Sequence, residues 1–137
     1  MSQIIWDDSF SVNNAEIDVQ HKRWIEIYNN LDMKICTLST QLSDRLETLK
    51  TMEDYARYHF SFEEKYMRKI NYPKLVEHHR IHKNFNNLIY TYYRKVLDGE
   101  YVLGSEIISI LKEWLLDHIL EEDKRYALYN EEDKKVS

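Results

Sequence analysis

The sequence has very few of the residues that make tight turns or covalent cross-links. Its 137 residues include two glycines, one proline and one cysteine. Tight turns depend heavily on glycine and proline, so this scarcity argues against a β-rich fold with many turns. A single cysteine cannot form a disulfide within the chain, which fits a reducing compartment. The composition therefore predicts few turns and no internal cross-link.

Long apolar runs and dense runs of positive charge are also missing. No segment approaches the length of a membrane span, and residues 1–8 lack the positive and apolar regions typical of a secretory signal. The formal net charge is −5, which disfavours nucleic acid or an anionic membrane surface as the main partner. We therefore expect a cytoplasmic protein with no nucleic-acid or membrane partner, for which a monomer is possible.

What the sequence does contain is helical periodicity. Hydrophobic residues make up 43% of the chain and charged residues 31%, a normal balance for one globular domain. Apolar residues recur at intervals of three and four, which predicts amphipathic helices over about 18–38, 46–70, 75–98 and 104–126. Short connections favour an all-α, antiparallel up-down four-helix bundle. An N-terminal arm of about residues 1–17 and a short polar tail complete a single domain spanning 1–137.

Five of the six histidines fall on these expected helices together with two carboxylates. The set is His21, His59, Glu63, His78, His82, His118 and Asp123. Residues four apart lie within ~40° on a helix, so the 59/63 and 78/82 pairs can each point at one spot. Imidazoles with a minority of carboxylates suit iron, zinc or copper better than magnesium or calcium. Seven ligands are too many for one ion, which points to two metals.

Each member of this set has a simpler interpretation when it is taken alone. A lone inward histidine such as His21 is more often a hydrogen-bonded core residue than a ligand. His59 with Glu63 could be an ordinary helical pair, and His118 with Asp123 could be a surface ion pair. Polar groups on four converging apolar stripes are costly to bury unless they are paired, hydrogen-bonded or bound to a metal. The combination therefore favours a metal site.

Two positions near the set are set apart by helical geometry. His79 lies ~100° around the helix from His78 and should be exposed or lie behind the ligands. Glu64 is expected to be solvated.

On the last helix, Glu122 is four residues after His118, whereas Asp123 is five residues after and ~140° away on an ideal helix. Asp123 would need a locally wider turn, of the kind frequent at functional sites, so spacing alone leaves this choice open.

The combined motifs resemble the hemerythrins, specifically the single-domain prokaryotic bacteriohemerythrins. The matching residues span nearly the whole chain and include Trp6, Ile17-Asp18-Val19-Gln20-His21, His59-Phe60-x2-Glu63-Glu64-x2-Met67, Tyr72-Pro73-x4-His78-x3-His82, and Trp114-Leu115-x2-His118-Ile119-x3-Asp123-Lys124-x-Tyr126. The fourth-helix motif of that family is a histidine, four residues and an aspartate. The resemblance thus selects Asp123 over Glu122.

The resemblance implies a non-haem di-iron centre with an oxo or hydroxo bridge. One iron would be held by His78, His82 and His118 and the other by His21 and His59. Glu63 and Asp123 would bridge the two irons. This ligand count leaves one position open on the iron with two histidines, where dioxygen would bind.

The implied function is reversible oxygen binding by a carrier, store or sensor that is not an enzyme. An apolar pocket would protect the bound oxygen. Leu116 occupies the family's pocket position, and Trp114 and Ile25 are further candidates for which a plain core role is the simpler interpretation. The main alternative is a ferritin-like di-iron oxidase or iron-storage protein, but those sites need Glu-x-x-His motifs, and the chain has none. A structural zinc site would use fewer ligands.

Overall fold

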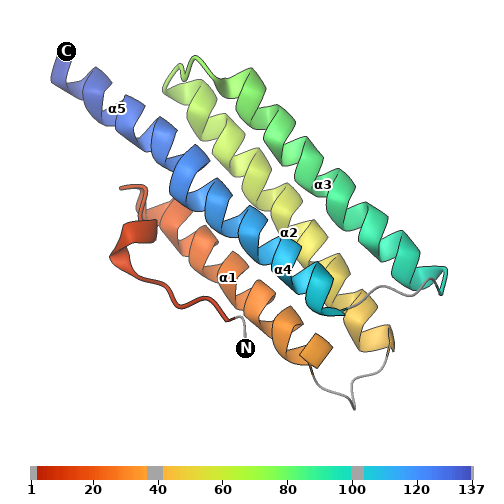
Figure 1. Ribbon diagram of the computed structural model, residues 1–137. Helices are drawn as coiled ribbons and strands as arrows, with labels where there is room; N and C mark the ends of the chain where they lie inside the picture. Colours follow the sequence, from red (N-terminus) through yellow and green to blue (C-terminus); the bar gives the residue numbers. More distant parts are fainter. Residues whose placement is uncertain (1–2, 37–41, 100–103, 137) are drawn as a thin grey trace.

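Four antiparallel helical rods form the protein, as the sequence predicts. The computed structural model describes residues 3–36, 42–99 and 104–136, and within these ranges it contains helices and no strand. The rods are α1 (Ala15–Cys36), α2 (Leu42–Lys69), α3 (Leu75–Leu97) and a fourth made of α4 (Gly104–Asp117), η2 (His118–Asp123) and α5 (Lys124–Val136). Figure 1 shows the rods packed side by side, with the fourth crossing the full length of the bundle.

The helix ends follow from a few local signals. Asn71 (φ 59°) and Gly99 (φ 79°) adopt the left-handed conformation that ends α2 and α3, which asparagine and glycine tolerate best. The Tyr72 N–H donates to the Met67 carbonyl (2.9 Å) and closes the turn before Pro73. The polar stretch that separates the first two helices falls largely in residues 37–41, outside the described residues.

The last rod is longer than the sequence predicts. Where we expected a short polar tail after Tyr126, α5 continues as helix to Val136. The segment lacks glycine and proline, and Tyr126 and Ala127 are buried. The Asn130 amide also donates to the Tyr66 hydroxyl (3.1 Å). These contacts dock the helix where periodicity alone was too weak to predict it.

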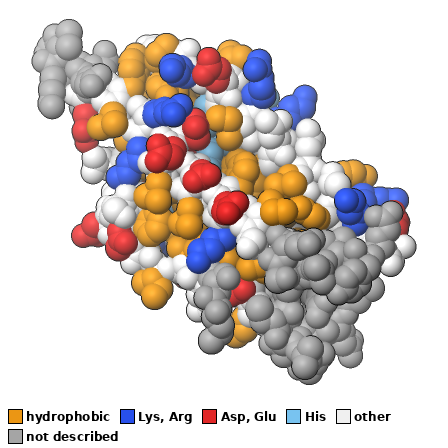
Figure 2. All heavy atoms as spheres, in the orientation of Figure 1, with side chains coloured by type: hydrophobic (Ala, Val, Ile, Leu, Met, Phe, Trp, Pro, Cys, Tyr) orange, Lys and Arg blue, Asp and Glu red, His pale blue; other side chains and the backbone are white. Residues whose placement is uncertain are grey.

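Two apolar clusters fill the bundle and leave a polar layer between them. The larger cluster includes Trp24, Phe60 and Phe85, and the smaller one is formed by Val12, Ile17, Met67, Tyr72, Tyr126 and Ala127. The outward side of the fourth rod is acidic instead, with Glu113, Asp117 and Glu121 exposed at intervals of four. Figure 2 shows acidic side chains along this face. None of the described helices is long and apolar enough to cross a membrane.

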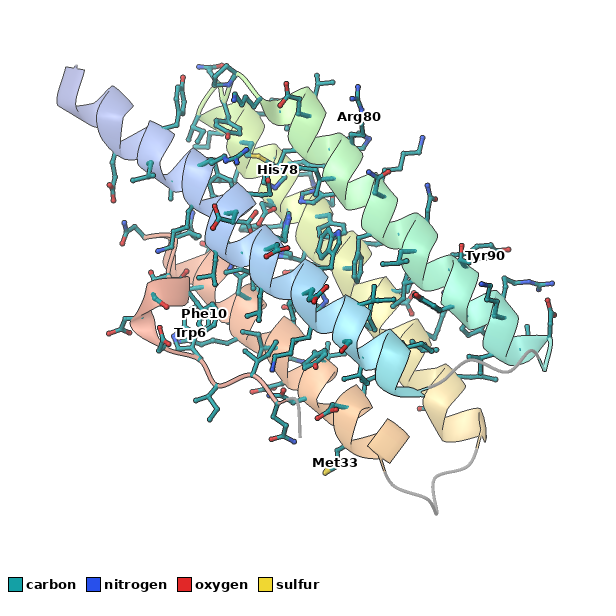
Figure 3. The ribbon with its side chains drawn as sticks, viewed as in Figure 1. Trp6, Phe10, Met33, His78, Arg80 and Tyr90 are labelled. Atoms are coloured by element: carbon teal, nitrogen blue, oxygen red, sulfur yellow. The ribbon has the colours of Figure 1, made fainter. Side chains whose placement is uncertain are left out.

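The N-terminal arm is fastened to α1 and to the middle of the fourth rod. Its short helix η1 (Asp8–Phe10) contacts η2, and Trp6 and Phe10 lie beside α1 (Figure 3). The Asp18 carboxylate accepts hydrogen bonds from the Ser11 hydroxyl (2.6 Å) and the Val12 N–H (2.9 Å). Lys124 donates to the Ser11 carbonyl (2.7 Å). The arm thus covers the turn that carries the last part of the polar layer.

Replacing the anchor of the arm should destabilise the protein measurably. Asp18→Ala removes two hydrogen bonds to a charged acceptor and is expected to lower the free energy of unfolding by about 1.5–3 kcal/mol. Urea denaturation followed by circular dichroism would measure this. Glu16→Ala is the matched control, because Glu16 is an exposed carboxylate in the same first turn. Equal effects in both variants would mean that the arm contributes nothing through Asp18.

Candidate metal centre

A π-helical turn brings His118 and Asp123 to the same face of the fourth rod. The six residues His118–Asp123 form η2, in which hydrogen bonds span five residues instead of four. Both side chains are buried, whereas Glu122 is partly exposed and lies 3.5 Å from Arg125. The wider turn reduces the angular offset that an i, i+5 pair has on an ordinary α-helix. Asp123, and not Glu122, therefore faces the interior.

All four rods contribute to the polar layer. The seven side chains of the set form two overlapping groups, and within each group one donor atom per residue lies within 4.8 Å of all the others. The larger group contains Glu63, His78, His82, His118 and Asp123, and the smaller contains His21, His59, Glu63 and Asp123. All seven residues are at most 2% exposed. The structure thus brings together every residue that the sequence nominated as a metal ligand.

The two carboxylates divide their oxygens between the two groups. Glu63 Oε1 lies 3.1 Å from His78 Nε2 and 2.9 Å from His82 Nε2, while Glu63 Oε2 lies 3.2 Å from His59 Nε2. Asp123 Oδ1 lies 3.1 Å from His78 Nε2, and Asp123 Oδ2 lies 2.9 Å from His21 Nε2. Glu63 therefore turns one oxygen to three imidazoles and the other to two, whereas Asp123 turns one oxygen to His78 and His118 and the other to His21.

These donor atoms converge without satisfying one another. Both ring nitrogens of His21, Nε2 of His59 and both carboxylate oxygens of Asp123 are buried and make no hydrogen bond. His82 Nε2 and His118 Nε2 lie only 3.2 Å apart. Donors at about 2.1 Å from a shared ion, at right angles, would lie about 3 Å apart. The spacing and the nitrogen-rich donor set fit transition-metal ions such as iron.

Two opposing effects, burial and the charged or polar groups nearby, set the pKa values of the polar layer. Burial alone would lower the pKa values of His21 and His78, but the carboxylates of Asp123 and Glu63 beside them outweigh burial and raise them to about 9 and about 10. Burial wins at His118 and lowers its pKa to about 4. The surrounding imidazoles, His59 foremost, hold the pKa of Glu63 well below its usual range against the effect of burial. Protons on some imidazoles thus balance the carboxylates, and cations can take the place of those protons.

Comparison with known proteins decides the family. The family model described as the Hemerythrin HHE cation binding domain matches residues 12–128. The chain belongs to the hemerythrin family. Bacteriohemerythrin from Stenotrophomonas maltophilia is 32% identical over 93% of this chain and 81% of its own length. A hemerythrin-like protein from Naegleria gruberi is 31% identical over 88% of each chain. The crystal structure of wild-type hemerythrin matches with a TM-score of 0.84 at 26% identity, over 92% of this chain and 96% of its own.

Aromatic rings surround the hemerythrin-like centre, including one that sequence reasoning missed. Trp24 is fully buried, and its ring centroid lies 5.2 Å from that of His59 and 6.2 Å from that of His118. Phe60 stacks on His82 with centroids 3.9 Å apart. Trp24 is three residues after His21 and therefore shares its face, a signal that the sequence already contained.

The three residues predicted to line the oxygen pocket differ in burial and in the side chains that they contact. Trp114 stacks on His118 with centroids 4.6 Å apart, and Ile25 is buried in the larger apolar cluster. Leu116 is half-buried and packs against the same cluster, while its neighbour Leu115 is fully buried. Their role in binding oxygen stays a prediction.

Three polar partners of the set were also missed or misjudged. Gln20 Oε1 lies 2.8 Å from His59 Nδ1, and the Tyr126 hydroxyl donates to Glu63 Oε2 (3.1 Å). The expectation that Glu64 is solvated is wrong, because its side chain is only 18% exposed and contacts His82 Nδ1 at 2.8 Å. These contacts join different helices, so spacing along one helix could not reveal them. His79 is exposed and lies outside both groups, as its helical position predicts.

Metal loading should release protons. Because the pKa values of His21 and His78 are raised to about 9 and about 10, both imidazoles hold protons at pH 7, whereas a ligand imidazole must be neutral. Adding ferrous or zinc ions to the metal-free protein at pH 7 is expected to release at least two protons per molecule, because the pKa of His82 is raised as well. Apparent affinity should rise with pH and level off above about pH 10. Titration in weak buffer with a pH indicator measures the release, and its absence would contradict the proton balance described above.

Proposed function

We propose that the protein binds dioxygen reversibly at a non-haem di-iron centre and acts as a carrier, store or sensor, not as an enzyme. The observation that carries this proposal is the division of each carboxylate between two unequal groups of imidazoles. Membership of the hemerythrin family and the buried donor set support two iron ions as the cofactor. A single structural ion would not use two carboxylates in this divided way.

The proposed ligands follow the grouping of the donor atoms. His78, His82 and His118 would hold one iron, and His21 and His59 the other. Glu63 and Asp123 would bridge the two ions, because each turns one oxygen to each group. The smaller group supplies one imidazole fewer, which favours an open position there. When bound, a pair of ferrous ions supplies the electrons that make oxygen binding favourable.

The protein's own residues would keep water away and hold the bridge in place. The rings of Trp24 and Phe60 are fully or almost fully buried beside the imidazoles, so they exclude water on the side of the larger cluster. We include Trp114, Ile25 and Leu116 in the proposed oxygen pocket. On the opposite side, the Tyr126 hydroxyl donates to Glu63 and orients its carboxylate. We also propose a cytoplasmic location, which the lone cysteine supports.

Oxygen binding can be tested directly on the iron-loaded protein. The protein is reduced without air, exposed to oxygen and then returned to an oxygen-free atmosphere while its near-ultraviolet and visible absorption is recorded. We expect a new absorption band that disappears when oxygen is removed and returns over repeated cycles. Irreversible oxidation with release of hydrogen peroxide, or growth of an iron mineral, would instead support the ferritin-like alternative.

The ligand assignment predicts different iron contents when a ligand histidine and an exposed histidine are replaced. His118→Ala removes a buried donor and is expected to reduce iron binding below two ions per chain. His79→Ala removes an exposed ring outside both groups and should leave two. Asp123→Asn and Glu122→Gln form a second matched pair, in which only the aspartate variant should lose iron. Iron content after gel filtration measures both pairs, and an equal loss within either pair would contradict the assignment.

A further inference from the structure

Glu64 connects an exposed histidine to a buried one. Its Oε2 lies 2.8 Å from His82 Nδ1 and its Oε1 lies 2.6 Å from His79 Nδ1. The exposed fraction falls along this path, from 59% for the His79 side chain to 18% for Glu64 and 1% for His82. A carboxylate oxygen can only accept, so both Nδ1 atoms carry the hydrogen in these contacts. One carboxylate is thus fixed by donors at both of its oxygens.

Three other imidazoles of the centre have weaker outer partners or none. His59 Nδ1 meets the neutral amide oxygen of Gln20 (2.8 Å). The Nδ1 atoms of His21 and His118 are buried without a hydrogen-bond partner among the described residues. Hydrogen bonds to an ionised acceptor are roughly twice as strong as neutral ones. His82 therefore has a stronger outer partner than His21, His59 or His118.

We propose that Glu64 is a positioning residue for the metal centre and that His79 holds Glu64 in place. By accepting from Nδ1, Glu64 fixes the tautomer and the orientation of His82, so that Nε2 faces the Glu63 and His118 donors. This inference rests on the proposed function, because it takes His82 to be an iron ligand. His79 touches no donor atom of the centre and acts only through Glu64.

Two physical consequences distinguish this arrangement from simple packing. A carboxylate behind an imidazole increases the basicity of the nitrogen that faces the metal and restricts rotation of the ring. The iron bound by His78, His82 and His118 should therefore be released more slowly than the iron bound by His21 and His59. An exposed side chain that never approaches the metal should also influence the release of one iron only.

The test measures iron release from the fully loaded protein into a strong chelator. Glu64→Ala is expected to accelerate release of the iron at the three-histidine group by about 10- to 100-fold. His79→Leu should accelerate the same phase to a smaller extent. His79→Gln, which keeps an N–H donor, should restore part of the wild-type rate. Mössbauer spectra of ⁵⁷Fe-loaded Glu64→Ala are expected to show one of the two iron environments changed.

Matched controls separate positioning from general stability. Glu26→Gln alters an exposed carboxylate that pairs with Arg23 on α1 (3.0 Å) and should leave both release phases unchanged. Thermal unfolding of the iron-free variants shows whether the bundle itself is weakened, and the exposed His79 can be replaced without disturbing the core. Equal acceleration of both irons, together with a lower unfolding temperature, would overturn the inference in favour of a structural role.

The inference and the proposed function fail in different ways. If the wild-type protein does not bind two irons, the proposed function and this inference are both wrong. If the wild-type protein binds two irons but Glu64→Ala releases them at the wild-type rates, only the positioning role is wrong. A Glu64→Ala effect without any effect of His79→Leu would overturn the part assigned to His79.

Discussion

Two fully buried carboxylates, Glu63 and Asp123, are the constraint on which the rest of this structure depends. An ionised group deep in a protein is costly unless opposite charge and hydrogen-bond donors surround it. Five imidazoles provide that environment, and they come from four different helical rods. Because each carboxylate must serve imidazoles on both sides, the rods have to converge at one level of the bundle. The fold is thus organised around a charged layer as well as around its apolar clusters.

The same constraint explains the irregular fourth rod. An α-helical path from His118 would present residue 122 to the interior, whereas the π-helical turn presents Asp123. Such turns are rare and are frequently found at functional sites. The N-terminal arm covers this turn, and Lys124 fastens it to the Ser11 carbonyl. A local departure from regular helix geometry is therefore supported by a segment far away in the sequence.

The polar layer is covered by aromatic rings on one side and has polar side chains behind its imidazoles. Aromatic rings such as Trp24 and Phe60 close it off on one side, which suits a hemerythrin centre that must hold oxygen while excluding water. Polar contact with the outside passes through Glu64 behind His82, whereas Gln20 behind His59 is buried. These partners differ in charge, so the two unequal groups of imidazoles also differ in their surroundings. The asymmetry extends from the ligands to their outer partners.

The sequence by itself determined the helices, their order and the residues that can meet inside the bundle, because helical spacing is a local property. Helical spacing placed His59 beside Glu63 and His78 beside His82, and it separated His79 from these ligands. The choice of Asp123 came from family resemblance, since the π-helical turn leaves no signal in spacing. Only the tertiary structure decided which oxygen of each carboxylate faces which imidazoles, and that Glu64 is held between His79 and His82. Such contacts depend on the rotation and height of one helix relative to another, which the periodicity of a single helix does not contain.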